Sequence, residues 1–322
     1  MALALLLRSR LGGGPVMTAV VAAALFALVT NLVSRRVEGA RRAADRTVTA
    51  VVTAAFVIAL VPLVSLVYTV VTRGAARFDT AFFTETMRNV VGAGGGARHA
   101  IAGTLIITLL TAAISVPVGL FTAIYLVEYG RGRIARSITL LVDVMTGIPS
   151  IVAGLFAYAL FVIIVGPGVR FGIGGAVALS VLMTPVVVRA SEEMLKLVSA
   201  ELREASYALG VPKWRTIVKV VLPVAAAGIA TGITIAVARV IGETAPLLLI
   251  VGTSKSLNLS PFEGRMETLP VYTFYSFTQP GVPPEAGLER GWSAALVLMI
   301  IVLALNAVAR LISRVFAPKT GR

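Results

Sequence analysis

The 322-residue chain has no cysteine, one histidine (His99) and few charged residues, which make up 14% of the total against about 25% in a typical soluble domain. The lack of cysteine excludes disulfides, thiol catalysis and Cys-ligated zinc or iron–sulfur sites. With a single histidine, neither a His-based metal site nor a catalytic triad is expected. Hydrophobic residues make up 57% of the chain, so its composition is not that of an ordinary cytosolic protein.

Seven long apolar runs without charges divide the sequence, and each reaches or approaches the roughly 18–20 residues that cross a bilayer as a helix. We therefore predict an all-α fold, a polytopic transmembrane helix bundle with a six-span core over residues 47–322. Residues 1–46 are predicted to add a retained transmembrane helix and a basic cytoplasmic linker, since no good small-x-small cleavage site precedes the arginines. The runs are Leu11–Ser34, Thr47–Thr72, Ala100–Val127, Val144–Val169, Phe171–Val188, Val220–Ala238 and Gly291–Ala309.

The distribution of basic residues predicts the orientation in the membrane. The formal charge is +14, and the densest basic cluster, Arg35–Arg46, is expected to stay cytoplasmic because short basic loops resist translocation. Alternation then puts 18 Lys and Arg residues in cytoplasmic segments and 10 in external ones. This predicts an external N-terminus and a cytoplasmic C-terminus. Nucleic-acid binding is not expected, because the charges are spread over every inner loop instead of one soluble face.

A candidate helix break lies at Gly147 and Pro149, in the middle of a long apolar stretch. One interpretation is ordinary membrane packing, because proline is tolerated wherever neighbouring groups satisfy the backbone. The other is a break that exposes backbone groups to a cavity. The pattern favours the first interpretation, and the sequence assigns no role to the nearby Asp143.

The longest inner loop, about residues 190–220, is too structured for a linker. From Ser199 its pattern predicts an amphipathic helix, with Ser199 as the cap and glutamates near the start. Gly210 is expected to end this helix, and a second helix should begin around Trp214 and enter the membrane. Two interpretations remain open: an interfacial helix that lies on the lipid, or a helix that contacts another protein.

One motif in this loop resembles a known family. Glu204-Ala205-Ser206, followed by Gly210 and then by Leu222-Pro223, is similar to the EAA motif of ABC importer permeases. Ser206 replaces the usual second alanine, and Val220 replaces the usual isoleucine. The resemblance implies that the loop forms a coupling helix, which docks in a cleft of a cytoplasmic ATPase.

Two charged residues follow the sixth apolar run, where a buried charge is costly. The i, i+4 spacing of Arg239 and Glu243 predicts that both lie on one helical face. Gly228, Gly232 and Ala236 precede them on nearly the same stripe, which can pack tightly against another helix. The pair could be a structural ion pair. Alternatively, the pair marks a substrate pathway, in which the guanidinium binds an oxyanion and the glutamate lowers the affinity of that binding.

The stretch from Arg239 to Leu247, ARVIGETAPL with the preceding alanine, resembles phosphate ABC transporter permeases of the PstA type. Further similarity lies at Val142-Asp143, at 147–154 and at 189–194. The resemblance implies a bacterial inner-membrane importer with a PstC-type permease, a PstB-type ATPase dimer and an external PstS-type phosphate-binding protein, which would meet the external loop at about residues 253–290. No cofactor is expected in this chain. ATP and Mg would bind the partner subunits, because neither Gly12–Gly14 nor Gly94–Gly96 has the lysine of a phosphate-binding loop.

Three alternatives remain open at the level of sequence. A permease for another oxyanion, such as sulfate or molybdate, would use the coupling loop equally well. A secondary transporter or channel without ATP would not need that loop, and the sequence has no inverted repeat of broken helices. A membrane scaffold or sensor would not need Arg239 and Glu243 in its spans. The leading prediction is a phosphate importer permease that is not itself an enzyme.

Overall fold

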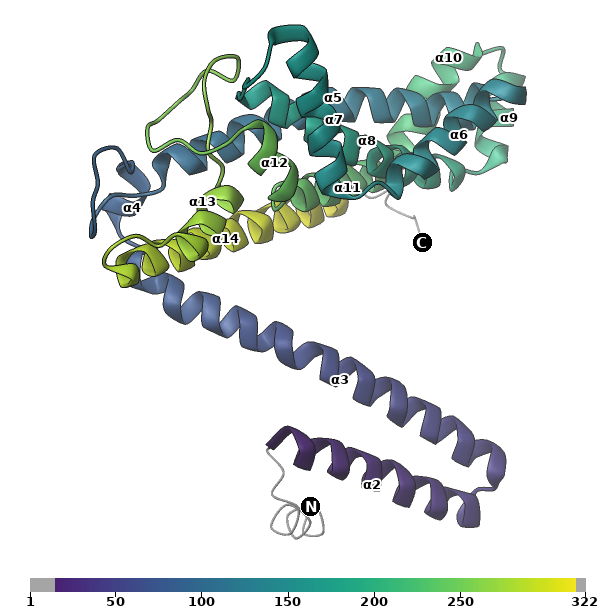
Figure 1. Ribbon diagram of the computed structural model, residues 1–322. Helices are drawn as coiled ribbons and strands as arrows, with labels where there is room; N and C mark the ends of the chain where they lie inside the picture. The colour runs from purple at the N-terminus through teal and green to yellow at the C-terminus, as the bar shows by residue number, and fades with distance from the viewer. Residues whose placement is uncertain (1–14, 317–322) are drawn as a thin grey trace. The chain divides into compact units, whose positions relative to one another are not determined.

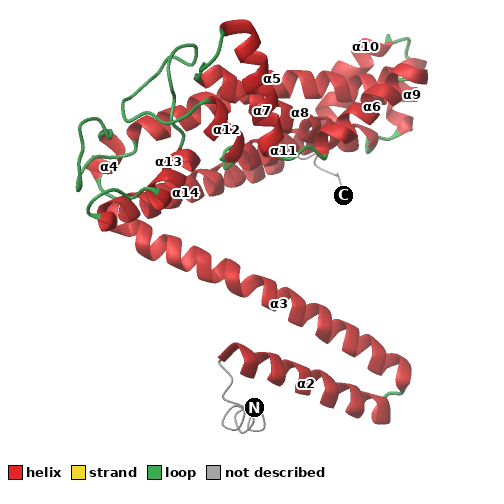
Figure 2. Ribbon diagram, viewed as in Figure 1, coloured by secondary structure: helices red, strands yellow, loops and turns green. Residues whose placement is uncertain are grey.

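The computed structural model describes residues 15–316, with side chains over residues 21–312. Helices joined by loops make up the described chain, and no strand occurs in this range (Figure 2). It divides into two units, Met1–Thr69 and Val70–Arg322. The all-α prediction is therefore confirmed. The first four residues of the first predicted span, 11–14, lie outside the described residues.

The first unit contains a pair of helices, α2 (Pro15–Val37) and the beginning of α3 (Ala40–Gly74). Gly39, with φ +90°, forms the turn between them. Polar contacts hold the pair at this end, where Asn31 Nδ2 donates to Thr47 Oγ1 at 2.6 Å and Arg46 pairs with Glu38 at 2.5 Å. The basic cluster predicted as a linker is thus mostly helical.

The second unit contains the end of α3 and the remaining helices (Figure 1). In chain order they are the 3-10 turn η1 (Ala75–Arg77), α4 (Thr80–Thr84), α5 (Arg98–Ile124), the π-helical turn η2 (Tyr125–Tyr129), α6 (Gly132–Thr146), α7 (Ser150–Val165), α8 (Gly172–Lys196), α9 (Ala200–Ala208), α10 (Lys213–Thr216), the π-helical turn η3 (Ile217–Val221), α11 (Leu222–Val240), α12 (Ala245–Ile250), α13 (Leu269–Thr278) and α14 (Pro284–Phe316).

Five helical segments of the described chain are long and apolar enough to cross a membrane, and a sixth is a bent pair. The pair consists of α6 and α7, which meet at an angle of 110°. The fourth predicted run, Val144–Val169, falls on this bent pair, because the helix ends at Thr146 and restarts at Ser150. The break at Gly147 and Pro149 is therefore present, although the sequence favoured ordinary packing. The other five core spans fall on α3, α5, α8, α11 and α14. Helix α2 covers the extra N-terminal span, which is not among these segments, so its membrane crossing remains a prediction.

The centre of the second unit is the seam between α5 and α8. One face of α5 carries small or polar residues at every fourth position, and all of them are buried: Gly103, Thr111, Ser115, Gly119 and Ala123, with Ile107 in the same row. A Cβ on Gly119 would lie 2.7 Å from the Val187 side chain on α8. Small residues let two membrane helices approach closely where lipid provides no hydrophobic drive. The packing of α5 against α8 therefore fixes the two ends of the unit, and the candidate sites lie at these ends.

The predicted small-residue stripe of α11 packs against α8, as expected. A Cβ added to Gly232 would lie 2.6 Å from the Cβ of Ala190, and Gly228 faces Met194. Ala236 continues the stripe and is buried with Met183. Helix α11 is therefore held along its length by α8, which also leads into the coupling loop.

Candidate coupling loop and transport pathway

The coupling loop begins later than the sequence suggested, because α8 continues to Lys196. The charged residues after Val188 were expected to lie in the loop. They instead form a ladder on the helix, in which Glu192 pairs with Arg189 at 2.8 Å and with Lys196 at 2.7 Å. Oppositely charged residues three or four positions apart stabilise a helix. The irregular part of the loop therefore shortens to the residues around α9.

Helix α9 lies where the sequence predicts it, between Ser199 and Gly210. Ser199 occupies the N-cap position, but its side chain makes no capping hydrogen bond, so this part of the prediction is wrong. At the other end Gly210 has φ +75°. The Gly210 amide donates to the Tyr207 carbonyl at 2.9 Å, and the Val211 amide donates to the Ser206 carbonyl at 3.2 Å. These two bonds form a Schellman motif, which favours glycine at this position.

Helix α9 is attached to the rest of the unit by buried polar contacts. Arg203 donates to one carboxylate oxygen of Glu128, in η2, through Nε at 3.0 Å and through Nη2 at 2.8 Å. The Glu128 side chain is only 5% exposed. Ser206, where the motif usually has alanine, lies 2.8 Å from the buried Thr216 hydroxyl of α10. The departure from the motif thus adds a hydrogen bond within the loop.

The opposite face of the loop is exposed and partly apolar. Glu204 and Ala205 are exposed, as are Leu209 at 84% and Trp214 at 58%. Pro223, after Leu222, stands in the first turn of α11, directly after the π-helical turn η3. Both of these large apolar side chains, Leu209 and Trp214, are thus open to contact with another group.

The helix is broken at the candidate positions Gly147 and Pro149, both of which are exposed. The break directs α7 toward α12. A Cβ on Gly154 of α7 would lie 2.6 Å from Pro246 Cα of α12. The two stretches that carry the resemblance to phosphate permeases, 147–154 and 239–247, are therefore in contact through Gly154 and Pro246.

Arg239 and Glu243 do not share a helical face, which corrects the sequence interpretation. Helix α11 ends at Val240, and the Glu243 amide donates to the Val240 carbonyl at 3.1 Å in a tight turn. Among the described side chains, neither residue takes part in an ion pair. Arg239 is exposed and Glu243 is half-buried. A structural ion pair between them is therefore not seen, and both remain available to another group.

A contact that the sequence did not predict links α6 to α8. Arg189 pairs with Asp143, which lies one turn before the helix break, as well as with Glu192. In the sequence, Asp143 and Arg189 belong to two charged motifs that lie 46 residues apart, and nothing local indicates that they pair. No cluster of three or more His, Cys, Asp or Glu side chains that could hold a metal occurs within the described part of the chain.

Residues 115–322 match the family described as "Binding-protein-dependent transport system inner membrane component". Two solved structures have the same fold. One is the inward-facing MetNI methionine ABC transporter, with a TM-score of 0.53, 21% identity, and coverage of 69% of this chain and 94% of that chain. The other is a bacterial alginate ABC transporter in complex with its periplasmic protein, with a TM-score of 0.60, 14% identity, and coverage of 86% and 97%. The fold and the family model define a multi-pass ABC importer permease, a class of transport protein and not of enzymes.

Curated relatives narrow the class. The chain is 48% identical over 275 residues to phosphate transport system permease protein PstA 1 of Mycobacterium tuberculosis, with 84% of this chain and 89% of the relative covered. It is 45% identical to PstA of Mycobacterium leprae (86% and 91% covered) and 38% identical to PstA of Yersinia pestis (88% and 95% covered). The chain belongs to the binding-protein-dependent transport system permeases and, within them, to the PstA type.

Proposed function

We propose that this chain is the transmembrane permease subunit of an ATP-driven importer and forms, with a homologous permease, the pathway for inorganic phosphate. The observation that carries the proposal is the 45–48% identity to PstA permeases over most of the chain. The contact between Gly154 and Pro246 joins the two stretches that resemble the phosphate branch, which supports phosphate over another oxyanion such as sulfate or molybdate.

The partners follow from this function. A PstC-type permease completes the pathway, a PstB-type ATPase dimer binds ATP and Mg, and an external PstS-type protein delivers phosphate. Helix α9 and its exposed neighbours Leu209 and Trp214 form the surface for the ATPase. Their end of the unit is then cytoplasmic, the end with α4 and α13 is external, and the protein lies in the bacterial cytoplasmic membrane with its C-terminus inside.

Arg239 and Glu243 line the pathway in this proposal. A guanidinium keeps its charge and offers a planar fork of donors that fits an oxyanion. Arg239 is exposed on this chain alone, so the partner permease supplies the other wall of the pathway. Glu243 limits the affinity, which suits a conduit because an ion must leave as readily as it enters.

The test is uptake of labelled phosphate by vesicles that contain the co-purified complex, with the external binding protein present. Uptake should require ATP and should resist competition by excess sulfate or molybdate. Uptake without ATP would indicate a secondary transporter, and displacement by sulfate or molybdate would indicate a permease for another oxyanion.

A further inference from the structure

A pocket of about 620 Å³ opens at the end of the second unit that contains α13. Its lining comes from α13, from the start of α14 and from two loops around Gly92 and Lys255. None of the residues predicted for the coupling loop or the pathway lines it. The charged and polar groups of this pocket therefore need an explanation other than ATPase coupling or the predicted pathway pair.

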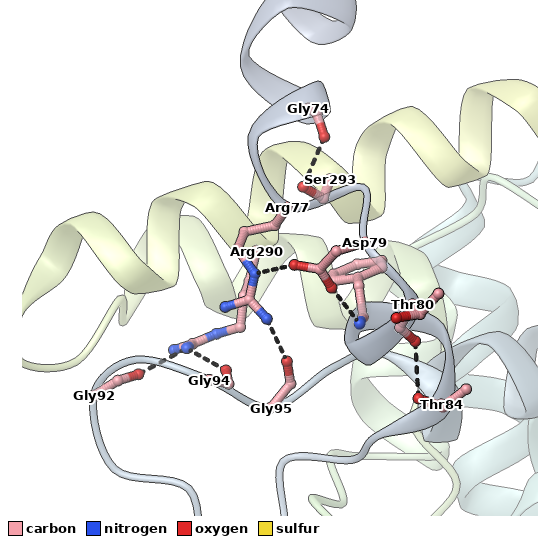
Figure 3. Close-up of polar contacts among 11 residues, drawn as sticks. Gly74, Arg77, Asp79, Thr80, Thr84, Gly92, Gly94, Gly95, Arg290 and Ser293 are labelled. Carbon is pink, nitrogen blue, oxygen red and sulfur yellow. Dashed lines mark hydrogen bonds and ion pairs between the residues drawn. The ribbon is translucent and has the colours of Figure 1, made fainter.

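Arg290 of α14 is a buried cation in this lining, only 6% exposed. Its Nη1 donates to the carbonyls of Gly92 at 2.7 Å and Gly94 at 3.0 Å (Figure 3). The neighbouring Arg77 also donates to this loop, at the Gly95 carbonyl, but it has a carboxylate partner, Asp79, at 3.1 Å. Arg290 has no acidic partner among the described side chains. A buried charge without a counter-charge is costly, so Arg290 favours an anion beside it.

Tyr272 of α13 adds a second polar group to the lining, and the residue is only 5% exposed. Its O–H has no acceptor within the described part of the chain, because the nearby Arg290 guanidinium can only donate to the phenol oxygen. Burial raises the pKa of Tyr272 to about 12, although the Arg290 charge opposes this shift. The phenol is therefore a protonated donor at neutral pH. The exposed Lys255 adds a positive charge at the rim.

One carboxylate also lines the pocket, and it lies beside a buried histidine. Glu267 Oε2 lies 3.2 Å from Nε2 of the buried His99. Among the lining side chains, the two positive charges of Arg290 and Lys255 outweigh the single negative charge of Glu267. This balance disfavours a cation and favours a small anion that can accept from both Arg290 and Tyr272.

We propose that this pocket binds a free inorganic phosphate ion before it enters the membrane pathway, with Arg290 and Tyr272 as its donors and Lys255 at the entrance. The inference rests on the proposed function, which makes this end of the unit external. Arg290 binds the ion through the donors that do not hold the loop. The competing occupant is an acidic side chain of the external binding protein, and the experiment below separates the two.

The absence of native cysteine permits a direct measurement on the assembled permease–ATPase complex without the binding protein. A single cysteine is introduced as Gln279→Cys, which lines the pocket and is exposed, and its rate of labelling by an impermeant maleimide is measured. Ser256→Cys, exposed but not in the lining, is the matched control. Inorganic phosphate should slow labelling at position 279 only, and chloride at the same ionic strength should not.

Tyr272→Phe tests the site with little change in shape, whereas replacing Arg290 would also release the loop at Gly92. Adding Tyr272→Phe should raise the half-protecting phosphate concentration by about tenfold, as for the loss of a hydrogen bond to a charged ligand. Equal protection with and without Tyr272→Phe, or none by phosphate, would overturn the proposal. Protection only by the phosphate-free binding protein would assign the pocket to docking. The labelling measurement does not require transport. It therefore tests the pocket independently of the proposed function, which the phosphate-uptake assay tests.

Discussion

The contact between Arg203 and Glu128 yields a prediction about the order of α9. Arg203→Ala removes a guanidinium that donates twice to the 5% exposed Glu128 carboxylate and also to the Leu195 carbonyl at 2.9 Å. A hydrogen bond to a charged group contributes about 1.5–3 kcal/mol, and the carboxylate left behind stays buried without its partner. We expect local opening of α9 to become easier by at least this lower value, which is roughly a tenfold change in the opening equilibrium.

The assay is amide hydrogen exchange of residues 200–208 in the purified complex. Exchange in this segment should rise by about 10- to 100-fold in Arg203→Ala, and the α5–α8 seam should not change. Arg215→Ala is the matched control, because Arg215 is an exposed arginine of the same loop that only stacks on Trp214. Unchanged exchange in Arg203→Ala, or an equal rise in Arg215→Ala, would refute the reasoning.

Two further predictions concern packing and coupling. Gly232→Val forces a side chain against Ala190 and should lower the stability of the assembled protein by about 1–3 kcal/mol, measured as a fall in Tm. Gly242→Ala should not lower the Tm, because a Cβ there would meet only the Arg239 carbonyl at 3.9 Å. Equal Tm values for the two variants would contradict the tight packing of α11 on α8. Glu204→Lys on the exposed face of α9 should leave the protein inserted but separate ATP hydrolysis from phosphate uptake. Phosphate uptake at the wild-type rate in Glu204→Lys would contradict a coupling role for Glu204.

The sequence predicted most of the helices because apolar runs of bilayer length have few alternatives to a helix. It was less successful where charge was taken as a sign of a loop. The residues after Val188 remain helical, since the spacing of Arg189, Glu192 and Lys196 stabilises the helix that was expected to end. The spacing was visible in the sequence, but the charge content was given more weight.

The candidate site was predicted in part. Gly210 ends α9 for a local reason, the left-handed backbone of a Schellman motif, and local reasons can be read from sequence. The i, i+4 argument for Arg239 and Glu243 required a helix through both residues, and α11 ends at Val240. The contact between Arg203 and Glu128 joins residues 75 positions apart. Such a pair depends on how η2 and α9 are placed in the fold, which no local pattern encodes.

If phosphate passes along residues of this chain, the double replacement of Arg239 and Glu243 by leucine should stop it. Removing both charges leaves no unpaired partner behind, so folding and assembly should survive. In vesicles with the complete complex, the quantity to measure is labelled phosphate taken up per ATP hydrolysed, compared with the wild type. We predict that the double mutant continues to hydrolyse ATP but no longer takes up phosphate. Normal phosphate uptake by the assembled double mutant would contradict it.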